Sequence, residues 1–85
     1  MIQWLNGTLK IIGKVHPIRE KWAKELMNLL ELEGYENVLD IGCGDGRITA
    51  EIAAKIPEGR IWGIDNSIEM IKLAQRTFPL KNILI

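Results

Sequence analysis

The stretch Val38-Leu39-Asp40-Ile41-Gly42-Cys43-Gly44-Asp45-Gly46 decides the fold of this chain. A short apolar run is followed at once by three glycines, which is typical of a buried strand that turns tightly into a helix. A second apolar run, residues 60–64, is closed by Asp65, about 20 residues after the glycine triplet. Because parallel strands end at one edge of a sheet, the turn and Asp65 are predicted to share a ligand crevice.

The surrounding sequence predicts an α/β fold made of alternating strands and helices. Apolar residues at helical spacing favour helices over about 17–31, from 45–47 to 56, and from Ser67 to Phe78. Strands are predicted at 37–41 and 60–64, and a third begins at 82–85. Right-handed crossovers between them give the strand order 3-2-1. The expected architecture is an N-terminal helix plus the β-α-β-α-β half of a Rossmann-like parallel sheet, truncated.

The N-terminal residues are harder to interpret. Gly7 and Gly13 interrupt the apolar residues there, which favours an irregular segment or a frayed helix over 1–16. The predicted organisation is therefore an irregular segment, 1–16, and a partial Rossmann-like cofactor-binding domain, 17–85. Each helix is expected to bury one apolar face. The predicted buried residues are Trp22, Leu26, Leu29 and Leu30 in the first helix, Ile48, Ile52 and Ile56 in the second, and Ile68, Ile71, Ala74 and Phe78 in the third.

Strand 37–41 would lie at an edge of such a half-sheet, although it would be central in a complete one. It is short and nearly uncharged, and an edge of that kind invites pairing with another chain. This predicts a homodimer through the exposed strand. It also gives an alternative function: a half-sheet assembly module whose ligand binding is vestigial.

Bulk composition excludes several classes of protein. Eighty-five residues form one domain at most, and 11 basic residues balance 11 acidic ones, so there is no basic footprint for nucleic acid. No apolar stretch is long enough to span a membrane, and the first residues lack the pattern of a signal peptide. Cys43 is the only cysteine and cannot form an intramolecular disulfide, which favours the reducing cytoplasm.

Glycine spacing separates two classes of nucleotide cofactor. Dinucleotide-binding turns favour G-x-G-x-x-G, whereas this chain has G-x-G-x-G, with Arg47 in the place of the last glycine. A dinucleotide-binding fragment is therefore a third and weaker interpretation.

Residues 38–46 resemble the first motif of class I S-adenosylmethionine-dependent methyltransferases. Gly63-Ile64-Asp65-Asn66-Ser67, with Glu69-Met70, resembles the segment that follows it in that family. Within that family, the chain resembles the subgroup of small-molecule methyltransferases similar to the trans-aconitate and malonyl-carrier methyltransferases. The resemblance covers about half of the chain, and it implies S-adenosyl-L-methionine as cofactor and a small-molecule methyl acceptor.

The resemblance also implies roles for individual residues. Asp40 and the backbone of Gly42–Gly44 would hold the methionine moiety, Asp65 the ribose hydroxyls, and Asn66 the adenine edge. Alternatives remain: Asp40 could satisfy loop amides, and Asp65 could cap the helix after it. No catalytic residue or metal ligand is predicted, and the piece alone is expected to be inactive because the acceptor site is absent. The predicted cofactor-binding residues are Asp40, Gly42, Cys43, Gly44, Gly46, Asp65 and Asn66.

Overall fold

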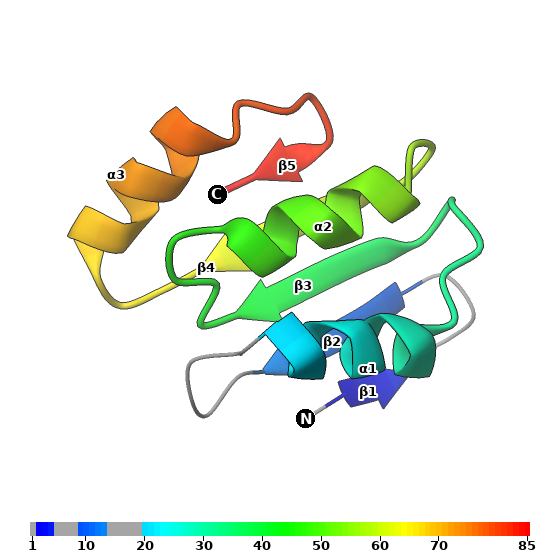
Figure 1. Ribbon diagram of the computed structural model, residues 1–85. Coiled ribbons are helices and arrows are strands. Elements are labelled where there is room, and N and C mark those ends of the chain that lie inside the picture. Colours follow the sequence, from blue (N-terminus) through cyan, green and yellow to red (C-terminus); the bar gives the residue numbers. More distant parts are fainter. Residues whose placement is uncertain (1, 5–8, 14–19) are drawn as a thin grey trace.

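A computed structural model describes residues 2–4, 9–13 and 20–85. They form one five-stranded sheet in the order β1-β2-β3-β4-β5, accompanied by three helices (Figure 1). The elements in chain order are β1 (Ile2–Trp4), β2 (Leu9–Gly13), α1 (Glu20–Leu30), β3 (Asn37–Ile41), α2 (Arg47–Lys55), β4 (Arg60–Ile64), α3 (Ile68–Thr77) and β5 (Ile83–Leu84).

Strands β2 to β5 are parallel, and β1 runs antiparallel to β2. The predicted α/β class and the neighbour order of the three expected strands, β5-β4-β3, are confirmed. Register decides where the site lies. Ile41 pairs with Ile64, so β3 and β4 end level with each other, and the residues after them emerge side by side.

The prediction that residues 1–16 form an irregular segment or a frayed helix is wrong where the structure describes them, because residues 2–4 and 9–13 are strands. Burial alternates along β2, with Lys10 and Ile12 buried between less buried neighbours. The buried lysine hid this alternation, because a charged side chain is rarely enclosed. Residues 14–19, where the first predicted helix would begin, lie outside the described residues.

The prediction that strand 37–41 is an edge strand is also wrong. In the structure β3 pairs with β2 on one side and with β4 on the other. Both rows of backbone N–H and C=O groups of β3 therefore have neighbours, so β3 offers no free edge to another chain, and the homodimer itself stays a prediction. The outer strands of the described sheet are β1 and β5.

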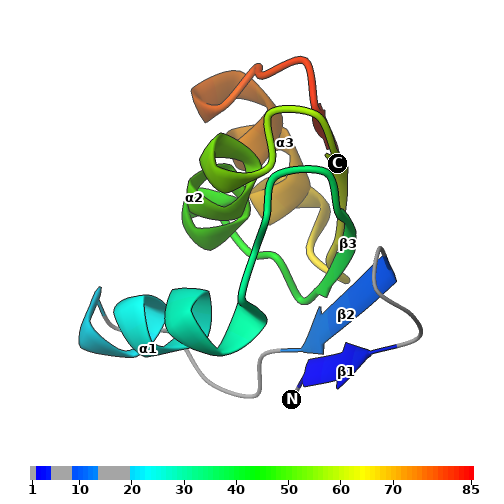
Figure 2. The same cartoon turned by 90° about the vertical axis from the view of Figure 1, so that its right-hand side faces the viewer.

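All three helices lie on one side of the sheet (Figure 2). Each crossover moves one strand further in the same direction, and right-handed connections then place every helix on the same face. The core lies between this face and the helices. It consists of Ile12, Leu26, Leu30, Val38, Ile48, Ile52, Ala53, Ile56 and Ile61.

Two helices bury less of their predicted faces than expected. In α1, Leu26 and Leu30 are buried but Leu29 is exposed, and the side chain of Trp22 lies outside the described ones. In α3 only Ala74 is buried, and Ile68 is 65% exposed. The reason lies in how α3 packs: Ala74 sits against the backbone of Gly46 at the start of α2. This close contact occurs near the C-terminal end of α3 and leaves its first turn outside the core.

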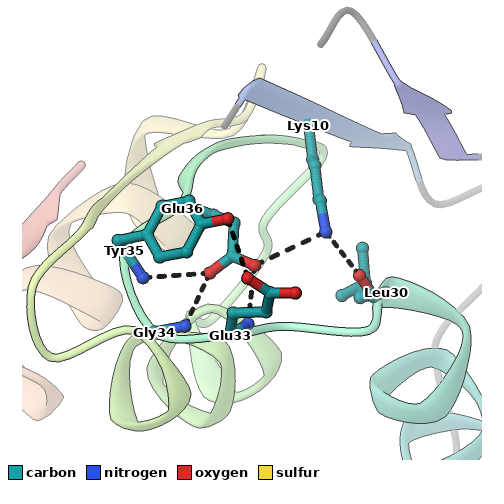
Figure 3. A network of polar contacts seen from close by, with 6 residues as sticks. All are labelled: Lys10, Leu30, Glu33, Gly34, Tyr35 and Glu36. Carbon is teal, nitrogen blue, oxygen red and sulfur yellow. Dashed lines mark hydrogen bonds and ion pairs between the residues drawn. The ribbon is translucent and has the colours of Figure 1, made fainter. Parts of the chain in front are cut away.

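A buried polar network joins β2 to the loop between α1 and β3 (Figure 3). The Lys10 Nζ donates a hydrogen bond to the Leu30 carbonyl oxygen at 2.7 Å and lies 3.6 Å from Glu36 Oε2. The same Glu36 carboxylate accepts the backbone N–H groups of Glu33 (2.6 Å), Gly34 (2.8 Å) and Tyr35 (3.1 Å). The network therefore fixes the end of α1, the start of β3 and the position of β2 at once.

Candidate ligand crevice at the ends of β3 and β4

The turn after β3 depends on backbone conformations that favour glycine. Gly42, Gly44 and Gly46 have φ angles of 76°, 59° and 84°. A Cβ added at Gly44 would meet nothing within 4 Å, so the Gly44 backbone borders open space. The turn therefore presents main chain, without a side chain in the way, to whatever occupies that space.

The turn is fastened to the end of β4. The Ile64 carbonyl oxygen accepts the N–H groups of Gly42 (2.7 Å) and Cys43 (3.0 Å). One oxygen of the Asp65 carboxylate, Oδ2, accepts the Gly44 N–H at 2.9 Å, and the other, Oδ1, accepts the Ser67 N–H at 2.8 Å. The glycine turn and the acid therefore converge, as the sequence predicted.

Asp65 keeps capacity for a ligand although it binds two backbone amides. An ionised carboxylate has about four lone-pair sites, and the two hydrogen bonds use one on each oxygen. The residue is partly exposed rather than enclosed. Asp65 can therefore accept the Ser67 amide and contact a ligand at the same time.

Asp40 lies behind the turn and is fully buried. Its Oδ2 accepts a hydrogen bond from the Thr49 hydroxyl, in the first turn of α2, at 2.6 Å. The Asp40 side chain therefore faces the protein interior rather than open space. Sequence reasoning did not single out Thr49. The available signal was a polar residue on the apolar face of the second helix, next to Ile48 and Ile52.

Cys43 and Gly46 serve packing in this structure. The Cys43 side chain is buried beside Gly63, where an added Cβ would lie 3.0 Å from the Cys43 Sγ. A Cβ at Gly46 would lie 2.8 Å from the Ala74 Cβ, so the third glycine admits α3 against the start of α2. Only the backbone of these two residues remains for a ligand.

Polar side chains accept backbone amides at the starts of both helices beside the crevice. The Asp45 Oδ1 accepts the Arg47 N–H at 3.1 Å at the start of α2. The Ser67 Oγ accepts the Met70 N–H at 3.3 Å, and Glu69 lies in the first turn of α3. Asn66 follows Asp65 directly and is exposed, so it can reach a ligand held by its neighbour.

The charges around the turn favour some ligands over others. Asp40, Asp45 and Asp65 all lie on or next to the turn, and the Gly44 amide, which could have held a phosphate, already donates to a carboxylate. Such a turn is a poor cradle for a pyrophosphate and accommodates hydroxyl groups and cations better. In the described part of the chain, no cluster of three His, Cys, Asp or Glu residues could hold a metal ion.

A separate hollow of about 520 Å³ lies between β4, the end of α3 and β5. Its lining is mostly apolar and includes Trp62, Ile64, Phe78 and Leu84. None of the seven predicted site residues lines it. The hollow therefore borders the crevice at Ile64 without being part of it.

Comparison with known proteins shows the family. The family described as "Methyltransferase domain" matches residues 38–84, which is more than half of the chain. The chain belongs to this methyltransferase domain family. The matched region begins in β3 and includes the glycine turn and Asp65, so the family match and the crevice coincide.

The relatives of this methyltransferase domain include trans-aconitate 2-methyltransferases. The enzyme of that name from Escherichia coli is 43% identical over 61 residues, covering 72% of this chain and 24% of the relative. The one from Azoarcus sp. is 34% identical over 61 residues, again covering 72% of this chain and 24% of the relative. The chain thus spans about a quarter of the length of these relatives. Within the described ranges of the methyltransferase domain, no helix is long and apolar enough to cross a membrane.

Proposed function

We propose that this chain is the S-adenosyl-L-methionine-binding part of a methyltransferase that acts on a small-molecule acceptor. The observation that carries the proposal is the position of the Asp65 carboxylate. It bridges the Gly44 amide of the glycine turn and the Ser67 amide before α3, and it retains lone pairs for two ribose hydroxyls. Membership of the methyltransferase domain family supports this assignment.

The residues around the crevice fit such a cofactor. The open space at Gly44 gives room for a ligand against the main chain. We assign the ribose to Asp65, the methionine moiety to the backbone of residues 42–44, and the adenine edge to the exposed Asn66. Asp40 is buried, so we assign it an indirect role through the shape of the turn.

When bound, the cofactor supplies a methyl group on a sulfonium, which is already a competent electrophile. The task left to this part of the chain is to bind and orient, and neither requires an acid or a base. A poorly ionised hydroxyl or amine acceptor would need a general base. No described residue is assigned that role, and we expect no turnover from these 85 residues alone. The single cysteine supports a cytoplasmic location.

Calorimetric titration with S-adenosylhomocysteine at neutral pH tests the proposal. We expect the wild-type chain to release or absorb heat on binding, and Asp65→Asn to bind at least about tenfold more weakly because it loses a charged acceptor. Glu69→Gln is the matched control, since it removes the same charge from an exposed position in the first turn of α3. This control should bind like the wild type.

Three outcomes would count against the proposal. One is the absence of heat from folded wild-type protein at millimolar S-adenosylhomocysteine. Another is tighter binding of NADH than of S-adenosylhomocysteine, which would restore the dinucleotide interpretation. The third is equal weakening by Asp65→Asn and Glu69→Gln, because binding would then depend on overall charge rather than on the Asp65 carboxylate.

A further inference from the structure

Thr49 connects the two ends of the glycine turn. Asp40 precedes the turn in β3, and Thr49 follows it in the first turn of α2. The Thr49 hydroxyl donates to Asp40 Oδ2 at 2.6 Å. This one buried hydrogen bond therefore links two residues that are nine positions apart on either side of the turn. Both residues are completely enclosed, with an exposed fraction of 0%.

Burial makes this hydrogen bond stronger and harder to replace. Water cannot substitute for the hydroxyl inside the core, so losing this donor costs more free energy than it would at the surface. The first turn of α2 contains no acidic residue of its own. The Asp40 carboxyl group lies against the first turn of α2, where it contacts Thr49.

The turn is held from two directions. From β4, the Ile64 carbonyl oxygen and the Asp65 carboxylate bind the amides of residues 42–44. From the protein interior, the hydrogen bond between Thr49 and Asp40 fixes the end of β3 relative to the start of α2. Removing the second support leaves the ends of the turn free to shift relative to each other.

We infer that Thr49 is a positioning residue for the cofactor: it holds Asp40 beneath the glycine turn so that the main chain of residues 42–44 is set for ligand binding. The inference rests on the proposed function, because the ligand is the one proposed above. Thr49 itself touches no ligand, and it acts through Asp40 and the turn.

The test is calorimetric titration with S-adenosylhomocysteine, accompanied by urea unfolding of each variant. Thr49→Val keeps the shape of the side chain and removes the hydroxyl. We expect it to bind about tenfold more weakly under conditions where it is folded, as the loss of about one hydrogen bond implies. Thr49→Ser keeps the hydroxyl and should restore binding to near the wild-type value. Ile52→Val, a fully buried change in α2 that leaves the Thr49 hydroxyl in place, is the control for a loss of stability alone.

The outcomes separate the inference from the proposed function. Wild-type protein that binds, together with unchanged affinity in Thr49→Val, overturns the inference and leaves the proposed function standing. Equal weakening by Thr49→Val and Ile52→Val, or a failure of Thr49→Ser to restore binding, also overturns it. Wild-type protein that does not bind refutes the proposed function and this inference with it. If Thr49→Val does not fold, Thr49→Ala takes its place in the comparison with Thr49→Ser, because these two variants also differ by the hydroxyl. Equal affinities of Thr49→Ser and Thr49→Ala for S-adenosylhomocysteine would overturn the inference.

Discussion

Replacing Lys10 with methionine should strongly destabilise the domain. The Lys10 ammonium is buried, lies 3.6 Å from Glu36 Oε2 and donates to the Leu30 carbonyl at 2.7 Å. At that separation and an effective dielectric constant of about 20, two unit charges attract by about 4–5 kcal/mol. Methionine is also unbranched and fills most of the same space, so the change mainly removes the charge and the donor.

The net cost is smaller than the attraction, because burying the ammonium is itself unfavourable. Breaking a buried pair from one side costs about 3–5 kcal/mol, and here Glu36 keeps three backbone N–H donors. We therefore expect the free energy of unfolding to fall by about 3 kcal/mol. A domain of this size has about 4–13 kcal/mol in total, so the loss is large.

Urea unfolding followed by far-ultraviolet circular dichroism measures this change. Lys24→Met is the matched control, since Lys24 is exposed on α1, and it should shift the free energy by no more than about 0.5 kcal/mol. The double variant Lys10→Met with Glu36→Gln should lose less than the sum of the two single changes, because the two side chains act on each other. A Lys10→Met variant as stable as Lys24→Met would refute the interpretation that this buried pair holds β2 in place.

Three further predictions concern particular positions. Gly59→Ala should destabilise the fold by about 3 kcal/mol or more in urea unfolding, because its Cβ would lie 1.9 Å from the Glu36 carbonyl oxygen, whereas Gly13→Ala, which meets nothing within 4 Å, should be nearly neutral. Burial raises the pKa of Glu36, but hydrogen bonds from backbone N–H groups and the Lys10 charge outweigh it and leave the pKa below its usual 4.5. The stability contributed by this carboxylate is therefore full at neutral pH and is lost as pH falls from above 4.5 through the lower folded-state pKa; unfolding from pH 7 to 3 should show it, and an equally steep loss in Glu36→Gln would contradict it. Gly44→Ala forces a φ of +59° on alanine without a clash, so it should cost about 1–2 kcal/mol of stability and weaken S-adenosylhomocysteine binding more than that loss explains; unchanged binding in calorimetry would show that the ligand does not approach Gly44.

Much of the crevice could be predicted because its determinants are local. Gly42, Gly44 and Gly46 follow a short apolar run directly, and only glycine adopts such backbone angles readily. Asp65 directly follows the next strand, and the rule that parallel strands end at one edge places it beside the turn. Ser67 caps α3 through a contact three residues along the chain, which a sequence pattern can show. At α2 the N-cap is Gly46, and Asp45 precedes it and accepts the Arg47 amide.

The direction of side chains within the crevice could not be predicted in the same way. Asp40 was expected to contact the ligand, but its orientation depends on which face of β3 the helices cover. Gly46 was grouped with the other glycines, whereas its packing against Ala74 depends on where α3 crosses α2. Both are contacts between separate elements, and the spacing of residues within one short motif does not predict either of them.

The pairing of the N-terminal strands also depends on contacts between segments that are distant in the sequence. β2 pairs with β3 although the two are separated by the whole of α1, and a parallel pair requires such a crossover. Lys10 is an ordinary charged residue in the sequence and becomes a buried one only because Glu36 and the Leu30 carbonyl receive it.

By itself, the sequence determined the alternation of strands and helices, the glycine turn, the acid beside it and the resemblance to methyltransferases. These features depend on backbone freedom and on periodicity over a few residues. The tertiary structure alone decided that β3 is flanked on both sides, that Asp40 is held by Thr49 beneath the turn, and that Lys10 is enclosed. The physical reason is that hydrogen bonds between strands and pairs of buried charges form between segments far apart in the chain, and their free energy depends on a partner that local sequence does not specify.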